Sequence, residues 1–157
     1  MEKLFWEDFP IGKLFRFGHY QVRAAEIIAF GKQFDPLPHH IGAEEAANSP
    51  LGVLCASGVH SLGMAQRMFC DHIFSQSGLI AGSGIEKYAL HIPVIAGYTL
   101  TVNALVVASE AHWKKHDRGW VKFEVQVFQQ DNIKVFSYDS RILFLKKTNS
   151  EVKQTLL

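Results

Sequence analysis

Asp35 and His40 are the residues whose types and spacing are best suited to chemistry. They are joined by the segment Asp-Pro-Leu-Pro-His-His, whose two prolines leave little backbone freedom. A carboxylate and an imidazole that face one water molecule can polarise it and pass a proton to a neighbouring carbon, which is general acid–base catalysis. The pattern alone also fits a surface turn, because Asp-Pro is common in turns and paired histidines are common on surfaces.

A short helix is expected immediately before this segment. From Ala24 to Phe34 the apolar residues recur with the spacing of one helical face. Pro36 disfavours helical geometry at the preceding residue, so the helix is expected to stop at Asp35. Residues 35–40 are then expected to be extended or turned, and a short helical piece is expected over residues 43–48.

The most apolar helix is expected over residues 57–74. One of its sides is expected to carry Val59, Leu62, Gln66, Phe69 and Ile73. Most of its other residues are small or apolar, and such a helix is usually buried. We therefore expect it to be buried nearly all round, with only its far end at Arg67, Asp71 and His72 reaching water.

Strands are expected on either side of this helix. Apolar and polar residues alternate over 100–109 and 121–127, which is typical of half-buried antiparallel strands. Residues 134–146 are expected to return as another strand, and residues 14–22 could form a first one.

These elements predict an α+β architecture. The available cover for a long central helix is a curved antiparallel sheet wrapped around it, which is the hot-dog fold. One sheet around one helix leaves an edge and a face open, so we expect a homodimer or a dimer of dimers. The length of 157 residues fits a single domain, expected over residues 1–146 with a tail at 147–157.

The composition argues against several classes of protein. Sixteen basic and fifteen acidic residues give a net charge of +1, which does not favour a nucleic-acid or membrane-surface binder. No signal peptide or membrane-spanning run is apparent. Cys55 and Cys70 are expected to be buried free thiols, which favours a cytoplasmic protein. The histidines and cysteines lack metal-ligand spacing, so no metal or other cofactor is expected.

The stretch from Phe30 to Met64 resembles the signature of MaoC-like dehydratases and (R)-specific enoyl-CoA hydratases. In that family an Asp lies at the end of a helix. It is followed in order by a Pro, a His, an acidic Ala-rich run, the motif Ser-x-x-Gly, and a glycine at the start of the central helix. The matching residues are Asp35, Pro38, His40, Ala43–Asn48, Ser49–Gly52, Ser57–Gly58, Pro93, Val94 and Gly97. The likeness covers roughly residues 5–146.

The resemblance implies a hydro-lyase of fatty acid metabolism that adds water to a trans-2-enoyl thioester, or catalyses the reverse reaction. The substrate would be an acyl-CoA or an acyl carrier protein thioester, with Asp35 and His40 catalytic. Ser57 and Gly58 would bind the substrate. The Gly58 N–H at a helix N-terminus could stabilise the electron-rich thioester oxygen, whereas Ser57 could equally serve only as the helix N-cap.

Two residues depart from the family pattern. The Asn that often follows the Asp at the second position is Leu37, and the acidic residue that usually follows Gly97 is Tyr98. Two other functions therefore stay open. One is a hot-dog thioesterase, in which a carboxylate activates water against the carbonyl carbon, and the other is a non-catalytic acyl-binding or assembly protein.

Overall fold

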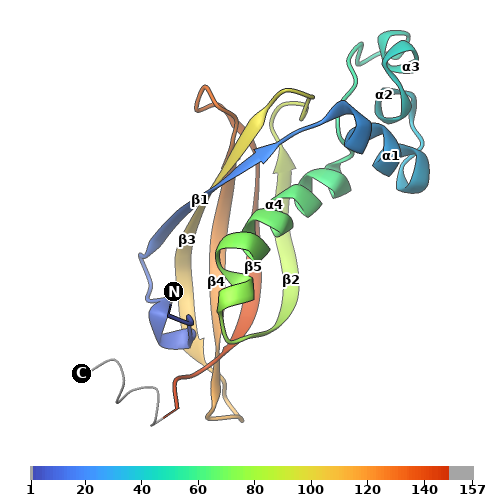
Figure 1. Ribbon diagram of the computed structural model, residues 1–157. Helices are drawn as coiled ribbons and strands as arrows, with labels where there is room; N and C mark the ends of the chain where they lie inside the picture. Colours follow the sequence, from blue (N-terminus) through green and yellow to red (C-terminus); the bar gives the residue numbers. More distant parts are fainter. Residues whose placement is uncertain (1, 149–157) are drawn as a thin grey trace.

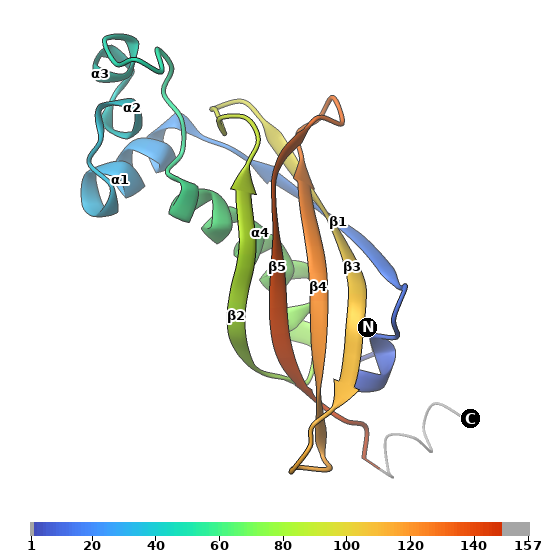
Figure 2. The ribbon, with the colours of Figure 1, turned by 180° about the vertical axis from the view of Figure 1, so that it is seen from behind.

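The computed structural model describes residues 2–148 and contains a five-stranded antiparallel sheet in the order β1-β3-β4-β5-β2. The sheet curves around one long helix, α4 (Figure 1; Figure 2 from behind). The strands are β1 (Leu14–Gln21), β2 (Leu79–Leu90), β3 (Thr99–Ala111), β4 (Arg118–Phe128) and β5 (Lys134–Leu145). The curved sheet around a central helix, expected from the sequence, is confirmed.

Three short helices lie beyond one end of the sheet, next to the start of α4 (Figures 1 and 2). They are α1 (Ala24–Phe34), α2 (Pro38–Ile41) and α3 (Ala43–Ala47). The long helix α4 runs from Gly58 to His72, and two 3-10 turns complete the set, η1 (Trp6–Asp8) and η2 (Phe74–Gln76). The chain therefore leaves the sheet after β1, makes a helical excursion, and returns through α4.

The alternating patterns of β3 and β4 place their apolar residues in the core. In β4, Val121, Phe123 and Val125 are fully buried. The alternating side chains between them are at least partly exposed. Because successive side chains of a strand point to opposite faces, this pattern buries the face toward α4. The expected strands at 100–109, 121–127, 134–146 and 14–22 are confirmed, with ends that differ by a few residues.

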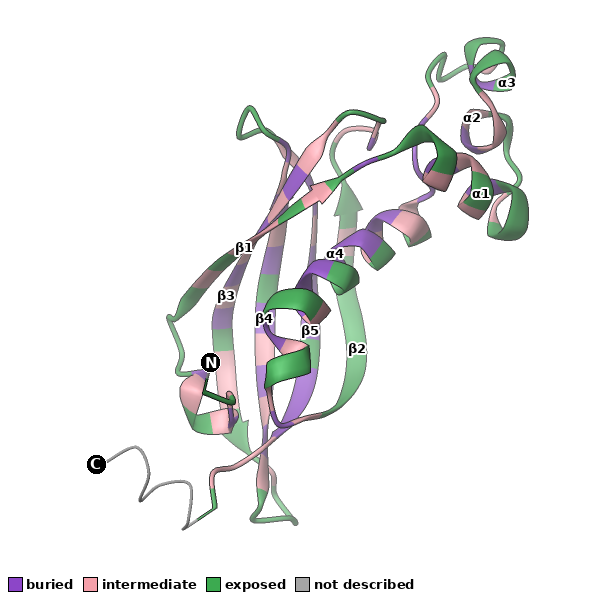
Figure 3. Cartoon of the chain, in the orientation of Figure 1, coloured by how far each residue is buried: buried purple, intermediate pink, exposed green. Residues whose placement is uncertain are grey.

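Helix α4 is buried on one side only, which corrects the expectation that it is buried nearly all round. Its buried residues are Ser61, Met64, Ala65, Met68 and Phe69. Val59, expected on the buried side, is 67% exposed, and Figure 3 shows the other face of α4 open. The physical reason is that a single five-stranded sheet can cover only one face of a helix.

Aromatic rings fix α4 against the sheet. Phe9 follows η1, is fully buried, and stacks on Phe144 of β5 with ring centroids 4.3 Å apart. Phe123 of β4 meets Phe9 edge-on at 5.8 Å and also meets Phe69 of α4 at 5.8 Å. Such offset and edge-on pairs are favourable ring arrangements. The aromatic cluster gives α4 a fixed position relative to the strands.

The expected tail at 147–157 lies mostly outside the described residues. Lys147 is described, and its ammonium group contacts the Asp8 carboxylate at 2.9 Å. Residues 149–157 are outside the description, so the single domain over residues 1–146 stays a prediction. Within residues 2–148, no helix has both the length and the apolar character needed to cross a membrane.

Candidate active site

Asp35 is presented by the C-terminal end of α1. The helix ends at Phe34, and the Asp35 N–H still donates to the Gly31 carbonyl oxygen at 2.9 Å. Asp35 itself is non-helical, with φ −150° and ψ 70°, as expected for a residue before proline. The helix stops at Asp35 as the sequence predicted, and the Asp35 side chain stays partly exposed there.

His40 is carried by α2, where the structure corrects the expectation of an extended or turned segment. Residues 38–41 form one helical turn. Pro38 occupies the first helical position, where its fixed φ suits a helix and its missing N–H is not needed. His40 is only 6% exposed. The surface-turn interpretation of the His-His pair is therefore wrong for His40.

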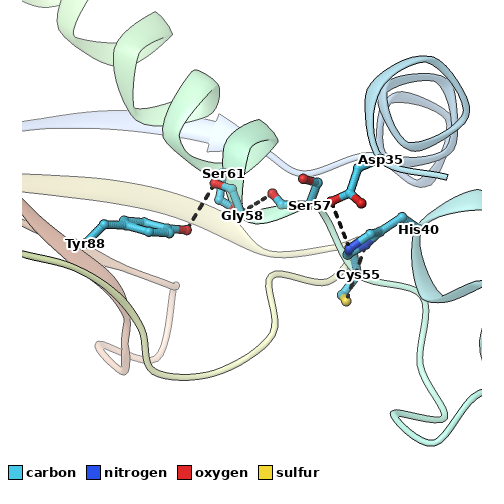
Figure 4. A network of polar contacts seen from close by, with 7 residues as sticks. All are labelled: Asp35, His40, Cys55, Ser57, Gly58, Ser61 and Tyr88. Carbon is cyan, nitrogen blue, oxygen red and sulfur yellow. Dashed lines mark hydrogen bonds and ion pairs between the residues drawn. The ribbon is translucent and has the colours of Figure 1, made fainter. Parts of the chain in front are cut away.

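The Asp35 and His40 side chains point toward each other (Figure 4). The His40 Nε2 and Asp35 Oδ2 atoms are 3.5 Å apart, while the side chain of His40 is 8% exposed and that of Asp35 is 33% exposed. This separation is long for a direct hydrogen bond and is suited to two groups that share a water molecule. The carboxylate therefore lies at the solvent-facing side of a buried imidazole.

The other nitrogen of His40 is held by the main chain. Its Nδ1 lies 2.6 Å from the Cys55 carbonyl oxygen. A carbonyl oxygen only accepts hydrogen bonds, so the Nδ1–H of His40 donates to it and Nε2 is the nitrogen that faces Asp35. Cys55 is in turn held by its N–H, which donates to the His39 carbonyl at 2.9 Å. Sequence reasoning missed this carbonyl, because every residue type carries one.

The Cys55 thiol also lies beside the imidazole, with its Sγ 3.9 Å from the His40 Nδ1. Both cysteines are free thiols; Cys55 is buried as expected, whereas Cys70 is only half-buried. Burial raises the pKa of the Cys55 thiol, so it stays protonated and is a poor nucleophile.

Ser57 occupies the N-cap position of α4, but its side chain does not cap the helix. The residue is 1% exposed, and its Oγ has no hydrogen-bond partner within residues 2–148. With Asp35, Phe30, Phe34 and Val59 it lines a pocket of about 380 Å³. A buried hydroxyl without a partner is unusual, and its place in a pocket suits a bound polar atom.

Gly58 is the first residue of α4 and lines a second pocket, of about 250 Å³, together with His40 and Cys55. The first N–H groups of a helix have no partner inside the helix and carry the positive end of its dipole. The four residues proposed from the sequence thus lie around the start of α4 (Figure 4). The same region holds Ser61 and Tyr88, which the sequence did not single out.

The amino-acid sequence from residue 8 to residue 133 matches the family model of the MaoC like domain. The chain belongs to the MaoC-like domain family. This span includes Asp35, His40, Ser57 and Gly58.

Solved structures share the fold of this MaoC-like protein. A MaoC-like dehydratase from Rhodospirillum rubrum is 29% identical, with a TM-score of 0.83 over 92% of this chain and 99% of that one. The unliganded R-hydratase PhaJ1 from Pseudomonas aeruginosa is 20% identical, with a TM-score of 0.72 over 92% of this chain and 88% of that one. The expected α+β hot-dog fold is confirmed.

A relative in Bacillus subtilis (strain 168), the uncharacterized protein YdeM, is 23% identical over 137 residues. The match covers 87% of this chain and 96% of the relative. The similarity therefore spans most of both chains, and the name of this relative assigns no activity.

Proposed function

We propose that this MaoC-like protein is a hydro-lyase that adds water to a trans-2-enoyl thioester to give an (R)-3-hydroxyacyl thioester, or catalyses the reverse. The observation that carries the proposal is the Asp35–His40 pair at 3.5 Å, with Nδ1 of the imidazole fixed by a main-chain carbonyl. The named dehydratase and R-hydratase of the same fold support the reaction class.

Asp35 and His40 supply two hydrogen-bond acceptors for the two protons of one water molecule. In the hydration direction, the water oxygen attacks C3 of the enoyl group while the C2–C3 π electrons move toward the thioester oxygen. His40 Nε2 takes the proton that leaves the water, and the carboxylate at 3.5 Å stabilises the imidazolium that forms. The same proton is then delivered to C2 as the thioester carbonyl re-forms.

The substrate oxygen gains negative charge during this reaction and needs hydrogen-bond donors. The Gly58 N–H, at the start of α4, would supply one. The unpartnered Ser57 hydroxyl, in the pocket that Asp35 also lines, would bind the acyl group or the shared water. Since the reaction adds only water across a double bond, it requires neither a metal nor a redox cofactor.

The deciding experiment is an assay of the purified protein with short-, medium- and long-chain trans-2-enoyl-CoAs. The proposal expects loss of the enoyl absorbance without release of free thiol. Thiol release with the enoyl absorbance retained would identify a thioesterase instead. Tight binding without either change would identify a non-catalytic acyl-binding protein. A parallel assay with acyl carrier protein thioesters tests whether the acyl group is carried by that protein instead of by CoA. The cytoplasmic location and the role in fatty acid metabolism stay predictions.

We also propose that the protein acts as a homodimer, or a dimer of dimers, through β2. This strand pairs with β5 on one side and forms an edge of the sheet on the other. It exposes Ile80, Ile85 and Leu90 by 37%, 55% and 46%. A long apolar edge strand with free backbone groups is a ready template for pairing with another chain.

Replacing Ile85 by Asp is therefore expected to convert the dimer to a monomer, because it places a charge on the proposed interface. Light scattering coupled to size-exclusion chromatography measures the mass. Ile133→Asp is the matched control, since Ile133 is 49% exposed in the turn between β4 and β5 and should leave the dimer intact. A wild-type monomer at working concentrations would contradict the proposal.

A further inference from the structure

Two hydroxyl groups that the proposed reaction does not yet use donate to carbonyl oxygens at the start of α4. Ser61 is fully buried, and its Oγ donates to the Ser57 carbonyl oxygen at 3.1 Å. Tyr88 reaches across from β2, and its hydroxyl donates to the Gly58 carbonyl oxygen at 3.1 Å. Figure 4 shows both bonds beside the Asp35–His40 pair. A strand side chain and a helix side chain thus bind two successive carbonyls.

These two carbonyls belong to the peptide groups that contain the Gly58 and Val59 N–H groups. Within residues 2–148 neither N–H donates to a protein acceptor. Peptide resonance links the oxygen and the N–H of one amide, so a hydrogen bond to the oxygen makes the N–H a stronger donor. The Ser57 oxygen also accepts the Ser61 N–H at 2.9 Å, which adds to the polarisation of the same amide.

The two hydroxyls are held in place by their surroundings. Burial raises the pKa of Tyr88, so its phenol stays protonated and remains a donor at neutral pH. Its ring packs against the start of α4, where a Cβ at position 58 would lie 3.4 Å from it. The Tyr88 ring therefore lies close beside position 58, with its hydroxyl in reach of the Gly58 carbonyl oxygen.

We propose that Ser61 and Tyr88 are positioning residues that orient and polarise the Gly58 and Val59 N–H groups toward the thioester oxygen of the substrate. The inference rests on the proposed function, because the charge that develops on this oxygen is what the two N–H groups would stabilise. Such stabilisation is stronger in the transition state than in the bound substrate. It should therefore act on kcat more than on KM.

The variants Tyr88→Phe and Ser61→Ala each remove one hydroxyl and keep the rest of the side chain or helix. Each is expected to lower kcat on the order of tenfold with KM nearly unchanged, since one supporting bond weakens but does not remove a donor. The pH profile of kcat should keep its shape, because neither hydroxyl titrates in the reaction. Tyr138→Phe is the control, as it removes a buried tyrosine hydroxyl on β5.

A spectroscopic measurement separates this inference from the proposed reaction. An enoyl-CoA with an isotopically labelled thioester carbonyl is bound to the Asp35→Asn variant, and the carbonyl stretching frequency is recorded by infrared difference spectroscopy. Binding should lower the frequency, and adding Tyr88→Phe or Ser61→Ala should reverse part of that shift. If one of the two variants does not fold, the other still tests the network, since each supports a different amide.

Unchanged kcat and unchanged carbonyl frequency in a folded Tyr88→Phe or Ser61→Ala variant would overturn the inference and leave the hydratase proposal standing. A wild-type protein that binds enoyl-CoA with no shift of the carbonyl frequency would also overturn it. A shift that depends on both hydroxyls, without any hydration by the wild type, would instead contradict only the proposed reaction.

Discussion

Asp35→Asn is expected to lower kcat for enoyl-CoA hydration at least about a hundredfold, because a neutral amide does not stabilise the imidazolium that forms on His40. His40→Ala is expected to have a similar effect through loss of the Nε2 acceptor. The side chains meet at 3.5 Å around one proposed water, so the pair acts as a unit. The double variant should therefore lose little more than the more damaging single variant.

The loss of enoyl absorbance measures these rates, and circular dichroism checks that the fold is kept. Asp71→Asn is a matched control, because Asp71 pairs with Arg67 at 2.9 Å on the exposed face of α4 and should not affect turnover. Turnover within a few-fold of wild type in a folded Asp35→Asn or His40→Ala protein would remove the pair from the mechanism.

Gly31→Ala is expected to inactivate the protein although Gly31 is outside the proposed chemistry. A Cβ at position 31 would lie 2.9 Å from the His40 Cβ and closer still to the His40 carbonyl oxygen. The contact is with backbone, so α2 must move away from α1 and carry His40 away from Asp35. A displacement of about 1 Å at a reacting group can lower the rate on the order of a hundredfold. Overpacking should also lower stability by roughly 1–3 kcal/mol.

Both effects are measurable, through kcat and through thermal or denaturant unfolding. Gly63→Ala is the control, since Gly63 lies in α4 with no atom within 4 Å of an added Cβ. This change should be neutral or stabilise by about 0.5–1 kcal/mol, as usual for glycine to alanine in a helix. An active, stable Gly31→Ala protein would show that the packing of α1 on α2 does not fix the His40 position.

The parts of the fold that were predictable are those with a regular pattern of burial. β3 and β4 alternate, so their apolar residues predicted both the strands and the buried face. β2 was not delimited, because nearly all of its residues are exposed and no alternation remains to detect. Val59 was predicted on the buried side of α4 because its side chain is apolar. In the single chain this side chain is 67% exposed, so the prediction was wrong.

Within the candidate site, the sequence predicted the proximity of residues that lie close together along the chain. Asp35 and His40 are five residues apart in a segment constrained by proline, and their resemblance to the family motif reinforced the prediction. Tyr88 contacts Gly58 from thirty residues away in sequence, through a hydroxyl bond that no local pattern indicates. The Cys55 carbonyl oxygen that binds His40 is a main-chain group. Every residue has such a group, so the sequence does not indicate which one binds the imidazole.

The helical excursion between β1 and α4 carries both members of the Asp35–His40 pair, and it lies beyond the end of the sheet (Figure 1). α1, α2 and α3 pack mainly on one another. The aromatic core that holds α4 to the strands is built from other segments. Selection on catalysis and selection on folding therefore act on largely separate stretches of this chain. After a gene duplication, one copy could lose the Asp35–His40 pair through changes confined to residues 24–47 while most of the core, to which this segment contributes Ile27, is inherited unaltered.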